Sequence, residues 1–203
     1  MEPEGRISKT HRWFRCAIAA YLFVLVLALT PWTPDPAGDI KRLLLALFSA
    51  SLAVAWLATT WRFGVPVRRP RIALEVLLGM LICYGAATLR SPYPGYSVTE
   101  LAFFGALFLL YFVATQVYTL ESEVLALMRV LCIAVALAAV YGLCQKFGLD
   151  PFPWTDRDLD IYTNLPSTFG NPNYAAHTLV LALIMAVALG LQRGGRWTWA
   201  LAA

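Results

Sequence analysis

The sequence predicts an all-α membrane protein: a polytopic transmembrane helical bundle with six full spans and the start of a seventh, cut short at its C-terminal end. Of the 203 residues, 60% are apolar and only 14% are charged, and the mean hydropathy is +0.65. A soluble domain is about 45–50% apolar and about 25% charged. One small globule cannot bury this excess, so the surrounding medium is lipid. Disordered chains, disulfide-stapled secreted domains and nucleic-acid-binding modules are thereby excluded.

The apolar residues are gathered in six runs of 17 to 20 residues, separated by segments rich in Pro, Gly and charge. A bilayer core of about 30 Å takes about 20 helical residues, so each run has spanning length. The backbone must satisfy its own hydrogen bonds in hydrocarbon, and continuous apolar character argues against alternating barrel strands. We therefore expect transmembrane helices over Trp13–Thr30, Leu43–Trp61, Ile72–Leu89, Leu101–Val117, Val124–Leu143 and Tyr174–Leu191.

The spans divide the chain into four segments. Residues 1–12 are expected to form a cytoplasmic N-terminal segment, residues 13–143 five helices with short loops, and residues 144–173 a long outer loop. Residues 174–203 hold the sixth helix and the start of a seventh, because Trp197–Ala203 is apolar but gives only about 10 Å of helix. The sequence therefore predicts a fragment or a truncated reading frame.

The orientation follows from the Lys and Arg residues, which concentrate in cytoplasmic loops. The N-terminal segment and the second and sixth loops carry ten of them: Arg6, Lys9, Arg12, Arg15, Arg62, Arg68, Arg69, Arg71, Arg193 and Arg196. The other side carries five, and Arg129 lies inside a span: Lys41, Arg42, Arg90, Lys146 and Arg157. This asymmetry predicts a cytoplasmic N-terminus.

The stretch Ser167-Thr168-Phe169-Gly170-Asn171-Pro172-Asn173 opens the sixth apolar run. Gly170 suits a backbone conformation closed to other residues, Asn171 or Asn173 can cap the following helix, and Pro172 fits a first helical position. This predicts a loop-to-helix joint. The alternative is a polar site where helix amides, aided by an Arg, meet a pyrophosphate. His177, one turn on, can bind a phosphate, act as a base or only satisfy a polar neighbour.

Three stretches together identify a resemblance: Tyr141–Gln145, then Gly148–Pro151 with Trp154, then Ser167–Asn173 opening an apolar helix. They resemble the O-antigen ligase and O-antigen polymerase superfamily over about Arg90–Leu191. The earlier Ser91-Pro92-Tyr93-Pro94 is similar to the preceding outer loop of that family. Relatives often carry an Arg just before the Ser-Thr-Phe-Gly-Asn stretch, and this chain has Asn164, Leu165 and Pro166 there instead.

The resemblance implies a multi-pass membrane glycosyltransferase of the bacterial inner membrane, acting in cell-envelope and lipopolysaccharide biosynthesis. Its donor would be an undecaprenyl pyrophosphate-linked glycan, and its acceptor hydroxyl would belong to lipid A-core, a glycan or a protein. The family's catalytic Arg and His lie further along than Ala203, so this chain alone is expected to be inactive. The substrate-binding candidates are Arg157, Asn171, Asn173, His177 and Arg90.

Two other functions stay open, a transporter or lipid-linked glycan flippase and a non-catalytic membrane scaffold. No internal repeat, as expected of many transporters, is found between the first and second three spans.

No cofactor, metal or nucleic-acid partner is predicted, and membrane lipids are the expected surroundings. The four cysteines have no CxxC spacing and fit packing roles. Asp156, Asp158 and Asp160 are interpreted as a solvated face, with a divalent-cation site as the alternative.

Overall fold

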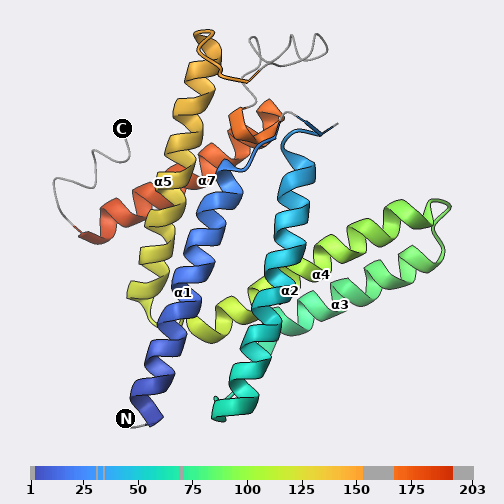
Figure 1. Ribbon diagram of the computed structural model, residues 1–203, viewed down its shortest axis with the longest axis vertical. Coiled ribbons are helices and arrows are strands. Elements are labelled where there is room, and N and C mark those ends of the chain that lie inside the picture. The colour runs from blue at the N-terminus through green and yellow to red at the C-terminus, as the bar shows by residue number, and fades with distance from the viewer. Residues whose placement is uncertain (1–2, 31, 34, 69–70, 153–166, 194–203) are drawn as a thin grey trace. The chain divides into compact units, whose positions relative to one another are not determined.

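The computed structural model describes residues 3–30, 32–33, 35–68, 71–152 and 167–193 (Figure 1). Within these ranges the chain forms six α-helices and one 3₁₀ turn, and contains no strand. The α-helices are α1 (Pro3–Leu27), α2 (Gly38–Phe63), α3 (Arg71–Leu89), α4 (Pro94–Val117), α5 (Glu121–Lys146) and α7 (Pro172–Arg193), and the 3₁₀ turn is η2 (Ser167–Phe169).

Each of the six apolar runs lies within or largely within one helix, which confirms the all-α fold. Five helices are long and apolar enough to cross a membrane, namely those spanning Lys9–Leu27, Gly38–Phe63, Pro94–Val117, Glu121–Lys146 and Pro172–Gln192. The apolar part of α3, Ala73–Leu89, is shorter. Only the described residues count toward that length, and α3 itself has 19 residues, so a sixth span stays a prediction. Trp197–Ala203, expected to begin a seventh span, lies outside the described residues.

The helices extend beyond the apolar runs at several ends. α1 begins at Pro3, so most of the expected N-terminal segment is helical. α5 continues to Lys146 and α7 begins at Pro172, which makes the connection between them shorter than the expected loop over 144–173. Polar residues in these terminal turns interrupt the hydropathy pattern without interrupting the helix.

Large apolar side chains are exposed all around several helices. In α7, Leu179, Val180, Leu181, Leu183 and Ile184 are all 41–60% exposed although they point in different directions around the helix. In water such a surface would be strongly unfavourable, whereas lipid tails are as apolar as leucine. The exposure agrees with helices that face hydrocarbon.

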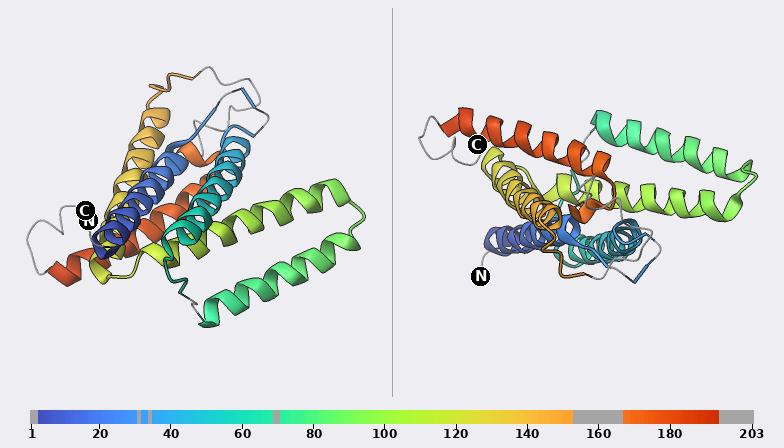
Figure 2. Two further views of the ribbon diagram at one scale, coloured as in Figure 1. Left: turned by 60° about the horizontal axis from the view of Figure 1, so that its bottom comes forward. Right: turned by 90° about the horizontal axis from the view of Figure 1, so that it is seen from above.

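Residues 1–18 and 42–119 form one compact unit, here the first unit. In it, α3 and α4 run antiparallel side by side (Figure 2). Trp56 of α2 is almost fully buried against Phe14 of α1, with their ring centroids 5.3 Å apart. The buried Gln116 of α4 accepts a hydrogen bond from the Arg68 backbone N–H at 2.8 Å and donates one to the Arg68 carbonyl at 3.0 Å. These two hydrogen bonds attach the α2–α3 connection to α4.

Residues 19–41 and 120–203 form the second unit, which contains η2 and the paired helices α5 and α7. The buried positions of α5 are mostly small, with Ala134, Ala138 and Gly142 recurring every four residues. Ala175, Ala182 and Ala186 are buried on α7. In lipid no hydrophobic effect drives helices together, so close van der Waals contact matters more. Small residues allow that contact because they let the helix backbones approach closely.

Candidate functional site

The Ser167–Asn173 stretch lies in the second unit, where η2 leads into α7. Ser167 and Gly170 both have positive φ, at 52° and 70°. Ser167 is buried; its hydroxyl donates to the Ala138 carbonyl of α5, and its backbone N–H donates to Gln145 Oε1 at 2.9 Å. Two hydrogen bonds to one helix hold Ser167 in a conformation that non-glycine residues seldom adopt.

Gln145 also connects η2 to the residues that follow α5. Its side chain is fully buried, and its Nε2 donates to Asp150 Oδ2 at 3.1 Å. The Asp150 carboxylate also accepts hydrogen bonds from the Tyr141 hydroxyl and the Phe152 backbone N–H, each at 3.0 Å. One glutamine therefore links Asp150, near the start of the α5–α7 connection, to Ser167 at its end.

Thr168 connects η2 to the ends of α1 and α2 that belong to the same unit. Its hydroxyl donates to the Val26 carbonyl at 2.7 Å, and its own carbonyl accepts a hydrogen bond from Lys41 Nζ. The Lys41 ammonium also lies 4.7 Å from the centre of the Phe169 ring, close enough for a cation–π contact. We call Lys41, Tyr141, Gln145, Asp150, Ser167 and Thr168 the joint cluster.

Asn171 begins α7. Its side-chain Oδ1 accepts a hydrogen bond from the Asn173 backbone N–H at 2.8 Å, and its carbonyl accepts one from Ala175. Pro172 occupies the first helical position, where its missing N–H costs nothing. Of the two asparagines expected as caps, Asn171 takes the role and Asn173 does not, while a role of either in binding substrate stays a prediction.

The structure brings three of the five candidate residues onto the first turns of α7. Asn173 and His177 are exposed there, near the half-buried Asn171. Arg90 is exposed at the end of α3 in the first unit. Arg157 lies outside the described residues, as do Asp156, Asp158 and Asp160. Among the described residues, no three His, Cys, Asp or Glu side chains are placed to hold a metal ion.

A crevice of about 230 Å³ lies beside the joint cluster and is lined by side chains of α5, η2 and α7, including Ala139, Phe169 and Leu179. Ser167 also lines it, but its hydroxyl is already bonded to Ala138. The remaining lining is apolar. The crevice suits a hydrocarbon chain better than a charged group.

The sequence did not predict the roles of Lys41, Gln145 and Asp150. For Lys41 the sequence predicts only a role in topology, although a cation so near an apolar run is a signal of a specific partner. Gln145 and Asp150 belong to the stretches that carry the family resemblance, but nothing in their spacing names Ser167 as a partner.

Comparison with protein families, curated proteins and solved structures found no match for this chain.

Proposed function

We propose that this chain belongs to a polytopic membrane glycosyltransferase of the O-antigen ligase type. The donor is an undecaprenyl pyrophosphate-linked glycan, and the acceptor is a hydroxyl of a lipid, a glycan or a protein. Five helices of spanning length and apolarity provide the membrane setting for such a donor.

One observation carries the proposal. The separate stretches that resemble the family, Tyr141–Gln145, Gly148–Pro151 and Ser167–Asn173, are joined through Gln145 and Asp150. Ser167 precedes the start of α7, where Asn171 caps the helix and Asn173 and His177 are exposed. A helix start of this kind favours anions, since its N–H groups and dipole both attract negative charge.

The proposal is tested by deleting the gene in the organism that encodes the chain and analysing its envelope glycans. A transferase predicts loss of glycan attachment, with the lipid-linked precursor accumulating on the outer face of the inner membrane. Restoring the full-length gene should reverse both effects. Accumulation on the cytoplasmic face would contradict the proposal in favour of a flippase, and an unchanged glycan profile would indicate a scaffold.

We further propose six spans, counting α3, with the N-terminus in the cytoplasm of a bacterial cell and the α5–α7 connection outside. Single cysteines at Val67 and Leu149, both exposed, test this in a cysteine-free background. An impermeant maleimide added to intact spheroplasts should label Leu149→Cys and label Val67→Cys only after lysis. The reverse pattern would overturn the orientation, and labelling of both from outside would contradict the number of spans between them.

A further inference from the structure

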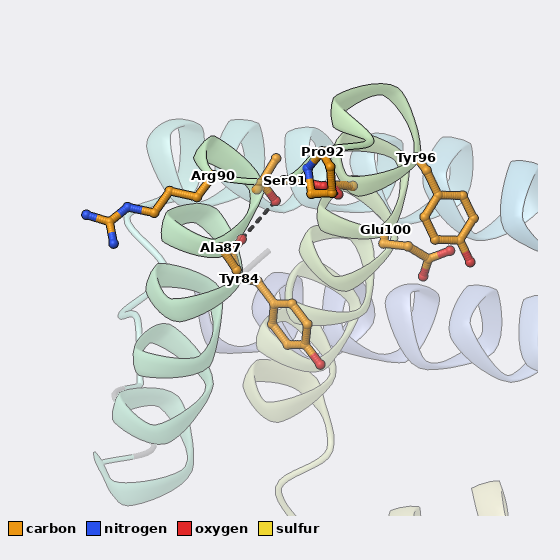
Figure 3. A pocket seen from close by; sticks show the side chains of 9 residues that line it. Tyr84, Ala87, Arg90, Ser91, Pro92, Tyr96 and Glu100 are labelled. Atoms are coloured by element: carbon orange, nitrogen blue, oxygen red, sulfur yellow. Dashed lines mark hydrogen bonds between the residues drawn. The ribbon is translucent and has the colours of Figure 1, made fainter.

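A hollow of about 420 Å³ lies in the first unit where α3 ends and α4 begins (Figure 3). Tyr84 and Thr88 line it from α3, Ser91 from the turn, and Tyr96 and Glu100 from the first turns of α4. The hollow is at the polar end of this helix pair, next to Arg90, rather than along the apolar middle. The joint cluster belongs to the other unit and contributes nothing to it.

The polar groups of the hollow divide into those already bonded and those available to a ligand. The Thr88 hydroxyl donates to the Tyr84 carbonyl at 2.8 Å, and the Ser97 hydroxyl donates to Ser91 Oγ at 2.6 Å. In the described part of the chain, the Tyr84 and Tyr96 hydroxyls have no hydrogen-bond partner. These two phenols can therefore donate to or accept from a bound molecule.

Glu100 adds a charged acceptor whose position is fixed. Its carboxylate lies 2.9 Å from the Arg42 guanidinium, which in turn lies over the Phe103 ring at 5.7 Å from the centroid. The Glu100 side chain remains 25% exposed, so the ion pair does not remove it from the wall of the hollow. A paired and oriented carboxylate forms stronger hydrogen bonds to hydroxyl donors than a neutral acceptor does.

The aromatic rings are also held in place. Tyr84 stacks on Phe104, with centroids 4.3 Å apart and planes 19° from parallel, so one face of its ring is covered. Tyr96 is 68% exposed at the rim. In Figure 3 the Arg90 side chain extends away from Tyr84, Tyr96 and Glu100. The hollow thus combines aromatic rings, free phenols and a carboxylate. Arg90 also lines it, but with its guanidinium extending away from these groups.

We propose that this hollow binds a hydroxylated ring of the kind found in a sugar residue. Such a ring offers C–H groups to the tyrosine rings and hydroxyl donors to Glu100, whereas a phosphate would meet an unfavourable carboxylate. A few oriented polar groups in a mostly apolar concavity are the usual composition of a small-molecule site. The site is independent of the proposed transferase, because a transporter or scaffold could carry it equally well.

The test uses saturation-transfer NMR on the chain in phosphatidylcholine nanodiscs, prepared without any sugar detergent so that the added probe is the only glycoside present. Octyl-β-glucoside is compared with an octyl oligo(ethylene glycol) ether, each below its micelle concentration. These probes share the octyl chain and differ in the headgroup. We expect saturation transfer to the glucose ring protons and none above background to the ether headgroup. Methyl-β-glucoside, which lacks the octyl chain, then distinguishes a free sugar from a glycolipid as ligand.

Substitutions in the wall of the hollow test whether the glucoside binds there. Tyr96→Ala and Tyr84→Phe should each weaken glucoside binding, and Glu100→Gln should weaken it by about tenfold or more, as expected for loss of a charge-assisted hydrogen bond. Tyr93→Ala is the matched control, because Tyr93 is on the same turn and 74% exposed but does not line the hollow. Equal signals from the two probe headgroups, or equal effects of Tyr93→Ala and Tyr96→Ala, would overturn the proposal. If Glu100→Gln misfolds after losing its Arg42 partner, Tyr96→Ala and Tyr84→Phe still decide whether the hollow binds the glucoside.

Discussion

Replacing Gln145 with alanine should lower the free energy of unfolding by about 3–5 kcal/mol. The side chain is fully buried and joins Ser167 to Asp150. Its removal leaves the buried Ser167 N–H without an acceptor, which costs about 1–3 kcal/mol, and the lost side-chain volume adds a cavity of about 2 kcal/mol or more. Asp150 loses a hydrogen-bond donor as well.

The measurement is thermal or denaturant unfolding of the purified chain in detergent micelles. Gln192→Ala is a suitable control, because Gln192 is an exposed glutamine of the same unit whose Nε2 donates a hydrogen bond to Glu121 Oε1 at 2.9 Å. Surface changes of this kind usually stay within about 0.5 kcal/mol. Gln145→Leu separates the cost of the lost hydrogen bonds from the cost of the cavity. The leucine side chain fills much of the volume but restores no hydrogen bond. If Gln145→Ala and Gln192→Ala were equally stable, the link would have no structural role.

The helical elements could be predicted from sequence because hydropathy reports the lipid environment directly. The helix ends could not, because their polar residues satisfy the backbone in ways that hydropathy does not measure. α4 begins at Pro94, seven residues before Leu101, and Thr99 in that extension donates to the Gly95 carbonyl of the same helix at 3.0 Å. α5 begins before its apolar run because the Glu123 side chain accepts a hydrogen bond from the Leu120 N–H.

The start of α7 is an exception among the helix ends, because a local sequence signal other than hydropathy marks it. A short polar side chain followed by proline is a local signal for a helix N-terminus, and Asn171 and Pro172 fill those positions. The partners of η2 were not predictable. Lys41 meets Thr168 across 127 residues, and Thr168 meets Val26 across 142. No periodicity or spacing within one segment encodes such pairs, which become visible only when the segments are packed together.

Gly170→Ala should destabilise the chain by about 2–5 kcal/mol. The residue has φ of 70°, a left-handed conformation that costs a side-chain-bearing residue about 1–2 kcal/mol. A Cβ added here would lie 2.8 Å from the Cβ of Ala37, which is closer than carbon atoms approach without repulsion. Ala37 is almost fully buried beside the start of α2 and cannot rotate away. Overpacking of this kind costs a further 1–3 kcal/mol, roughly.

Two further variants separate the two costs expected in Gly170→Ala, the backbone cost of the positive φ and the packing cost of the contact with Ala37. Gly148 has nearly the same φ, 69°, and a Cβ added there would have no neighbouring atom within 4 Å, so Gly148→Ala should show the backbone cost of about 1–2 kcal/mol alone. Adding Ala37→Gly to Gly170→Ala removes the opposing methyl group and should recover the packing cost of about 1–3 kcal/mol, apart from the cost of Ala37→Gly itself, which its single variant measures. Unfolding of the parent chain, both single variants and the double variant in the same micelles gives the coupling energy between positions 37 and 170 as a double-mutant cycle. A coupling energy of zero, or equal losses in Gly148→Ala and Gly170→Ala, would mean that the close approach of Ala37 to Gly170 does not constrain the start of α7.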